Sequence, residues 1–169
     1  MSFYSATYGS AGWSGNVEML KWLRERGLVA YNIDATYAAA RMGHLDALKW
    51  MKEVGEMDYM ASRVISGAAA RGHLHVVQWL VEAGARLHES VTERAARKGQ
   101  GVVLKWLVEH GCPMTNSACV AAAEAGHLAI LKWLVEHGCP FDREECLKHA
   151  RFVGKPSRPV LKWLKKYSL

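Results

Sequence analysis

The tetrapeptide Leu131-Lys132-Trp133-Leu134 occurs six times along the chain with small changes. Its other copies are Leu20-Lys21-Trp22-Leu23, Leu48-Lys49-Trp50-Met51, Val77-Gln78-Trp79-Leu80, Leu104-Lys105-Trp106-Leu107 and Leu161-Lys162-Trp163-Leu164. Successive tryptophans of these copies are separated by 28, 29, 27, 27 and 30 residues. Self-similarity at a period of this size indicates stacked supersecondary units rather than one closed core.

Each unit has the pattern of a helical hairpin. One glycine stands seven residues before most of these tryptophans and another five residues after, as Gly126 and Gly138 do around Trp133. This spacing predicts a helix of about ten residues that ends at the second glycine, where a positive φ is needed. Paired alanines further upstream, such as Ala122-Ala123, predict a preceding helix that packs closely on its neighbours.

Residues that can cap a helix mark the expected start of the first helix in several units. Asp34, Ser90 and Ser117 stand sixteen residues before their tryptophans and are predicted N-caps. Asp142 and Glu145 have the spacing of a capping box. Each unit is therefore expected to be helix, glycine turn, helix, glycine and short loop.

This unit resembles an ankyrin repeat, whose core reads A-A-x-x-G-H-L-x-x-[VL]-K-x-L-x-x-x-G. The similarity extends over residues 39–55 and 122–138, and over 68–84 with Gln78 in place of lysine. The copies followed by Gly-Cys-Pro, at Gly111 and Gly138, are similar to short ankyrin repeats common in large DNA viruses, oomycetes and algae. The opening T-P-L-H-x-A-A of the family is degenerate in this chain.

The resemblance implies an all-α solenoid of six ankyrin-type helical hairpins that form a single domain over residues 1–169. The expected repeats are 3–29, 30–57, 58–86, 87–113, 114–140 and 141–169. Loops such as the one from Gly111 to Ser117 are too short for the projecting β-hairpin finger of longer ankyrin repeats. The first and last repeats depart most from the pattern, as terminal caps do.

The cellular compartment and the state of the cysteines are predicted from sequence features that are absent. No run of about 18 uncharged apolar residues occurs, so we expect no membrane span. The first residues, 1–5, lack the features of a signal peptide, which predicts a cytoplasmic protein. The four cysteines are then expected to be buried free thiols, although a Cys112–Cys119 or Cys139–Cys146 bridge is geometrically allowed. No C-x-x-C pair supports a zinc site.

The most variable positions of the repeat are the two that close the first helix, nine and eight residues before the tryptophan. By resemblance, these positions line the concave groove of an ankyrin stack, and arginines and large aromatics often dominate interface energetics. Two tyrosines near the loops extend the same predicted surface. The predicted partner-binding residues are Trp13, Tyr31, Arg41, Met42, Tyr59, Arg71, Arg97 and Lys98. The alternative is that these residues form an ordinary solvent-exposed face that binds no partner.

Positive charge is concentrated at the C-terminal end. The net charge is +6, and residues 146–169 contain seven basic and no acidic residues. The predicted basic patch comprises Lys148, Arg151, Lys155, Arg158, Lys165 and Lys166. It is interpreted as a solubilising cap, as a dock for an acidic protein, or as a contact for nucleic acid or an anionic membrane surface. No aromatic stacking platform accompanies it, which leaves the nucleic-acid interpretation the weakest.

No recognisable catalytic, metal or cofactor motif is present, so the chain is predicted not to be an enzyme and to hold no metal or cofactor. His44, His73 and His127 recur at one position after the turn glycine, which favours a backbone hydrogen bond over catalysis. The repeated tryptophans are interpreted as packing groups rather than an exposed ladder for Pro-rich peptides or glycans.

The predicted function is a non-enzymatic protein–protein interaction module that presents a rigid concave surface. Its partner is expected to be another protein with an acidic surface, and the chain is expected to be a monomer by itself. One alternative is a binder of nucleic acid or of an anionic surface through the basic C-terminal repeat. A structural subunit of a larger assembly is the other.

Overall fold

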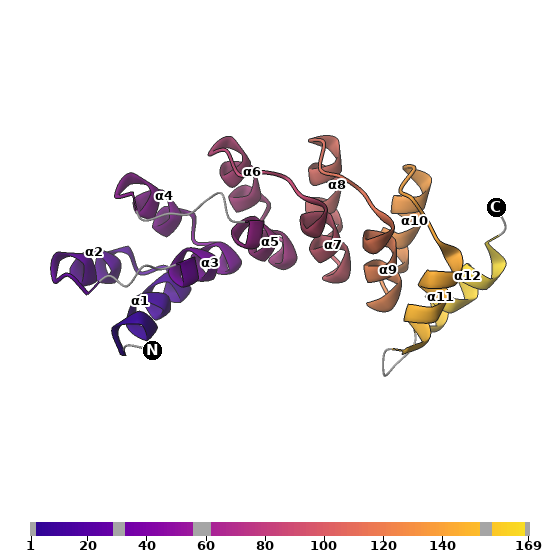
Figure 1. The fold of residues 1–169 in the computed structure, drawn as a ribbon, viewed down its shortest axis with the longest axis horizontal. Helices are drawn as coiled ribbons and strands as arrows, with labels where there is room; N and C mark the ends of the chain where they lie inside the picture. The colour runs from indigo at the N-terminus through magenta and orange to yellow at the C-terminus, as the bar shows by residue number, and fades with distance from the viewer. Residues whose placement is uncertain (1–2, 29–32, 56–61, 153–156, 168–169) are drawn as a thin grey trace. The chain divides into compact units, whose positions relative to one another are not determined.

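The computed structural model describes residues 3–28, 33–55, 62–152 and 157–167, which form helices and loops and contain no strand (Figure 1). The helices are α1 (Phe3–Ser14), α2 (Val17–Glu25), α3 (Ile33–Met42), α4 (Leu45–Glu53), α5 (Ser62–Arg71), α6 (Leu74–Glu82), α7 (Glu89–Arg97), α8 (Gly101–Glu109), α9 (Asn116–Glu124), α10 (Leu128–Glu136), α11 (Arg143–Phe152) and α12 (Arg158–Lys166). The predicted all-α class and the helix pair in each repeat are confirmed.

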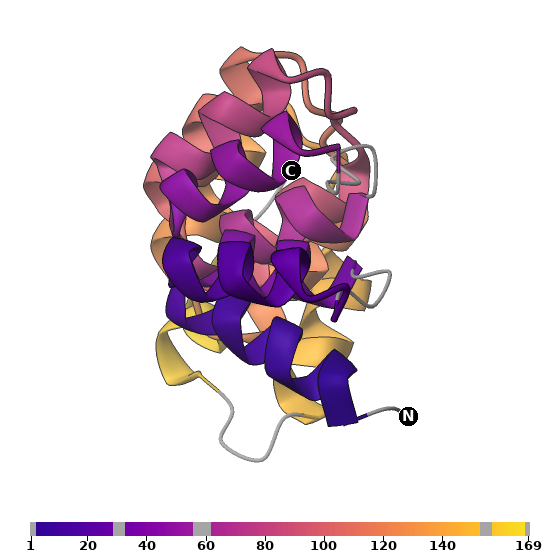
Figure 2. The same ribbon diagram turned by 90° about the vertical axis from the view of Figure 1, so that its left-hand side faces the viewer.

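The helix pairs are grouped in two compact units. Met1–Arg86 contains α1 to α6, and Leu87–Leu169 contains α7 to α12. Within each unit, each odd-numbered helix packs on the next odd-numbered one, and each even-numbered helix packs on the odd-numbered helix before it (Figures 1 and 2). The ends of the odd-numbered helices, which carry the variable positions, are therefore brought to neighbouring places along each unit.

Small residues allow the odd-numbered helices to pack closely. The paired alanines that the sequence repeats are fully or almost fully buried: Ala39, Ala40, Ala68, Ala69, Ala95, Ala96, Ala122 and Ala123. In the first repeat, Gly12 replaces the second alanine of the pair. A Cβ at Gly12 would lie 2.5 Å from the carbonyl oxygen of Ala35, so the backbones of α1 and α3 leave no room for one.

Helix starts differ from the sequence prediction in three repeats. The N-caps of α7 and α9 are the extended residues His88 and Thr115, each two positions before the predicted cap. The His88 ring accepts a hydrogen bond from the Ser90 amide at 3.3 Å, so an imidazole nitrogen replaces the expected hydroxyl. The prediction of Asp34, Ser90 and Ser117 as caps is wrong, because all three already lie in the first turn of their helices. At α11, Asp142 accepts from the Glu145 amide at 3.0 Å, as predicted.

The four cysteines are buried and free. In two loops the thiol donates to the carbonyl of the residue that caps the first helix of its own repeat, from Cys112 to His88 at 3.5 Å and from Cys139 to Thr115 at 3.3 Å. Burial raises the pKa of Cys112 to about 11 and that of Cys146 to about 12, so both thiols stay protonated at neutral pH. These bonds tie two short loops of the second unit to the start of the first helix of the same repeat.

A hydrogen bond between neighbouring repeats recurs at the turn histidine. The ring Nε2 lies near a carbonyl oxygen at the end of the first helix of the preceding repeat. Because a carbonyl oxygen only accepts, the ring nitrogen is the donor. The distances are 3.0 Å from His44 to Trp13, 3.1 Å from His73 to Arg41 and 3.2 Å from His127 to Arg97. The predicted backbone hydrogen bond is confirmed, and it crosses from one repeat to the next.

The turn glycine is required by both its backbone and its neighbour. Gly99 has a φ of 75°, and a Cβ there would lie 2.8 Å from the His127 ring of the next repeat. Gly15 and Gly43 have the same positive φ and the same close approach to the histidines of the following repeats. The glycine and the histidine thus form one inter-repeat contact.

Replacing Gly99 by alanine should destabilise the protein more than replacing Gly111. Both have positive φ, but a Cβ at Gly111 would meet no atom within 4 Å. Gly111→Ala should therefore cost only the backbone strain of about 1–2 kcal/mol. Gly99→Ala should cost about 1 kcal/mol more, because the displaced His127 ring loses its hydrogen bond. Urea unfolding followed by circular dichroism measures both, and equal losses would contradict the contact.

His73 should make stability fall in mild acid. Burial lowers its pKa from the usual 6.5, so just below pH 6.5 the unfolded chain binds the proton more readily than the folded one. The free energy of unfolding should therefore decrease as the pH falls from about 6.5 through the lowered pKa. His73→Gln should reduce this decrease, since Gln100 occupies the equivalent position in the fourth repeat. Urea unfolding of both proteins between about pH 8 and pH 5.5 checks it.

Candidate partner-binding surface

The predicted partner-binding residues that the structure describes lie at the C-terminal ends of odd-numbered helices. Trp13 is the next-to-last residue of α1, and Arg71 is the last residue of α5. Arg41 and Met42 are the last two residues of α3. Arg97 is the last residue of α7, and Lys98 is its C-cap. Tyr31 and Tyr59 lie outside the described residues, so the structure does not place the predicted extension of the surface.

In the first unit, side chains at the variable position contact each other across repeats. The Trp13 side chain is 46% exposed, and the guanidinium carbon of Arg41 lies 5.6 Å from the centroid of its ring. This is the geometry of a cation–π contact. Arg71 is exposed one helix further along, and Met42 is half-buried. An aromatic face and two cations are thus available on this unit.

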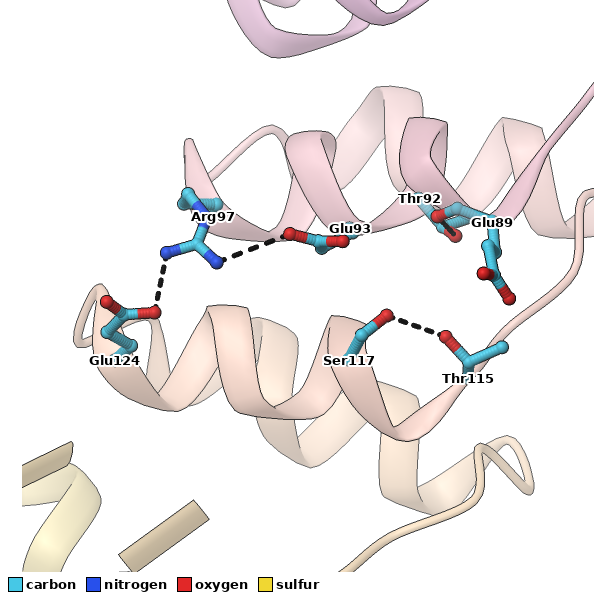
Figure 3. A network of polar contacts seen from close by, with 7 residues as sticks. All are labelled: Glu89, Thr92, Glu93, Arg97, Thr115, Ser117 and Glu124. Atoms are coloured by element: carbon cyan, nitrogen blue, oxygen red, sulfur yellow. Dashed lines mark hydrogen bonds and ion pairs between the residues drawn. The ribbon is translucent and has the colours of Figure 1, made fainter. Parts of the chain in front are cut away.

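In the second unit, the corresponding arginine is held by two carboxylates. Arg97 lies 3.3 Å from Glu93, one turn earlier in α7, and 2.5 Å from Glu124 at the end of α9 (Figure 3). Glu124 occupies in the fifth repeat the position that Arg97 occupies in the fourth. Lys98 is exposed and makes no ion pair with a described residue. This network is not among the features predicted from the sequence, although the spacing of one repeat period between Arg97 and Glu124 indicates it.

The Arg97–Glu124 pair should contribute modestly to stability. Both side chains are partly exposed, so we expect a coupling of about 0.5–1 kcal/mol from a double-mutant cycle with Arg97→Ala and Glu124→Ala. The coupling should decrease in about 1 M salt, where the Debye length is only about 3 Å. Urea unfolding of the four proteins gives this value, and a coupling of zero at low salt would refute the pairing.

The described cations of the basic C-terminal patch are all exposed. They are Lys148 and Arg151 on α11, and Arg158, Lys165 and Lys166 on α12. None of them forms an ion pair with a described residue, and Lys155 lies outside the described residues. Arg143 is engaged differently, because its Nε donates to the carbonyl of Leu164 at 2.7 Å and ties α11 to α12.

The repeated tryptophans are neither fully buried nor freely exposed as a ladder. Trp22 is 47% exposed, and the other five are half-buried. Trp106 stacks on His110 with ring centroids 3.9 Å apart, and His110 Nδ1 donates to the Trp106 carbonyl at 2.8 Å. The same stack is formed by Trp133 with His137. These two indoles thus also pack against the histidine that follows the C-terminal end of their own helix.

None of the described helices is long and apolar enough to cross a membrane. Among the residues that the structure describes, no cluster of three or more histidine, cysteine or acidic side chains could hold a metal ion.

The fold defines a helical repeat protein, and comparisons with known proteins specify its type. Residues 65–145 match the family model described as ankyrin repeats in three copies. The crystal structure of the human ASB11 ankyrin repeat domain is similar, with 19% identity and a TM-score of 0.72, over 96% of this chain and 83% of that one. A comparison with curated proteins finds no match. Residues 65–145 are thus ankyrin repeats, and the chain has the ankyrin repeat fold, which confirms the resemblance. Ankyrin repeats are generally non-enzymatic modules for protein–protein interaction.

Proposed function

We propose that this protein is a non-enzymatic interaction module that binds an acidic surface of another protein through the ends of α1, α3 and α5. The observation that carries the proposal is the exposed Trp13 ring with the Arg41 guanidinium over it, together with the exposed Arg71 at the end of α5. Arg97 and Lys98 occupy equivalent positions in the second unit. Because Arg97 is held by two carboxylates there, the first unit provides the more available cations.

The backbone of this surface is fixed before any partner arrives. The carbonyls of Trp13 and Arg41 each accept a hydrogen bond from a histidine of the following repeat. Residues held in this way lose little conformational entropy on binding, so more of the contact energy remains as affinity. Arginine and tryptophan are also the side chains most often found at interface hot spots. An acidic partner would complement Arg41 and Arg71.

Reversing two charges on this surface should weaken partner binding. The partner is first captured from native lysate by crosslinking, identified by mass spectrometry and purified. Arg41→Glu combined with Arg71→Glu should then raise the dissociation constant at least about tenfold, or about 1.4 kcal/mol. Lys21→Glu with Lys49→Glu is the control, since it changes the net charge equally on exposed positions of α2 and α4. Unchanged binding by the first variant, or equal loss in both, would remove this surface from the account.

The exposed cations of α11 and α12 favour one second candidate, binding of a nucleic acid or another anionic surface. Such binding would be dominated by counterion release, so its affinity would fall steeply and linearly on a logarithmic salt scale. A titration with a short duplex DNA at several salt concentrations, with Lys165→Glu and Lys166→Glu as comparison, separates this candidate from the first.

A further inference from the structure

An open apolar hollow lies between α8 and α10 of the second unit. It encloses about 290 Å³. Its lining includes Gly101, Val102 and Lys105 from α8 and Ala129, Ile130 and Trp133 from α10. The volume lies just below the range of about 300–1,000 Å³ of small-molecule sites, so it suits one side chain rather than a whole ligand.

The hollow exists because one repeat lacks a side chain. Gly101 is the first residue of α8, and the equivalent helix starts carry Val17, Leu45, Leu74 and Leu128. A Cβ at Gly101 would lie 3.8 Å from Cγ1 of Ile130, an ordinary van der Waals distance. Its φ is not positive, so neither the backbone nor the neighbouring atoms require glycine there. Packing therefore does not require a glycine at this position, and the missing side chain leaves the space open.

The rim of the hollow is apolar where other repeats are polar. Val102 is 71% exposed, and Ala129 at the equivalent position of the next repeat is also exposed. The corresponding residues of the first three repeats are Glu18, Asp46 and His75. Val102 and Ala129 thus extend the apolar lining of the hollow onto the exposed surface.

Charge around the hollow indicates what covers it. Lys105 lines the hollow and is exposed, with its Nζ 5.9 Å from the centroid of the Trp133 ring. It forms no ion pair with a described residue, including with the exposed Glu109 further along α8. A carboxylate-bearing partner would complement this cation. Two copies joined face to face at this site would bring their Lys105 side chains together instead, which disfavours a symmetric dimer.

We propose that this hollow, formed because Gly101 lacks a side chain and lined on one side by Lys105, receives one leucine or aromatic side chain from an acidic segment of another protein. The inserted side chain covers Val102, Ile130 and Trp133, and an acidic residue beside it pairs with Lys105. This surface is separate from the proposed one on α1, α3 and α5. The chain therefore has a second docking site whose failure leaves the first untouched.

The test uses the full chain and phage-displayed random 12-residue peptides, selected on the wild-type protein and depleted on Gly101→Leu. Gly101→Leu places in α8 the residue that α4, α6 and α10 already carry, so it should fold and fill the hollow. Selected peptides should combine aspartate or glutamate with leucine or an aromatic residue. They should bind Gly101→Leu at least about tenfold more weakly than wild type, and Lys105→Glu should weaken them as well.

Matched variants make each outcome decisive. Ser117→Leu adds the same side chain at an exposed position of α9 and should leave peptide binding unchanged. If Gly101→Leu fails to fold, Val102→Lys on the exposed rim replaces it, again with at least tenfold weaker binding expected. Peptides that bind every variant equally, or no selectable peptide at all, would overturn the proposal. Dimerisation in sedimentation that Gly101→Leu abolishes would assign the hollow to a second copy and overturn it too.

Discussion

A hydrogen bond from a turn histidine to a carbonyl of the preceding repeat joins three pairs of neighbouring hairpins. It requires the histidine at one end and glycine at the other, because the ring lies where a Cβ would otherwise be, as at Gly99 and His127. A helical hairpin of this size has too little core to be stable alone, so its structure depends on such contacts with the next hairpin. The paired alanines then bring the odd-numbered helices close enough to exclude water.

The same bond explains why the most variable side chains occupy the most regular backbone. Its acceptors are the carbonyls of Trp13, Arg41 and Arg97, which are the residues at the variable position. A carbonyl is present whatever the side chain, so this position can change from aromatic to cationic without loss of the inter-repeat bond. A fixed backbone with free choice of side chain is what a recognition surface requires, and here it follows directly from the packing.

The sequence alone predicts the features that depend on period and spacing, but not those that depend on individual side chains. Helix pairs, close-packed alanines, positive-φ glycines and the histidine bond all follow from repeated positions. The N-caps do not, because His88 replaces the hydroxyl that helix starts usually carry. Arg97 was expected to face a partner, and only coordinates show that Glu93 and Glu124 hold it. Gly101 is visible as a departure from the repeat, yet the space beside it depends on how α8 and α10 pack.

The two compact units differ in their reactivity toward thiol reagents. All four cysteines belong to Leu87–Leu169, and each is buried. A thiolate is the species that reacts with alkylating reagents, and burial keeps Cys112 and Cys146 protonated. Alkylation of Cys112 and Cys146 therefore proceeds only when the second unit opens, and the first unit, which has no cysteine, contributes no signal. The rate at which these thiols are alkylated thus reports local unfolding of the unit that contains the α8–α10 hollow, and of that unit alone.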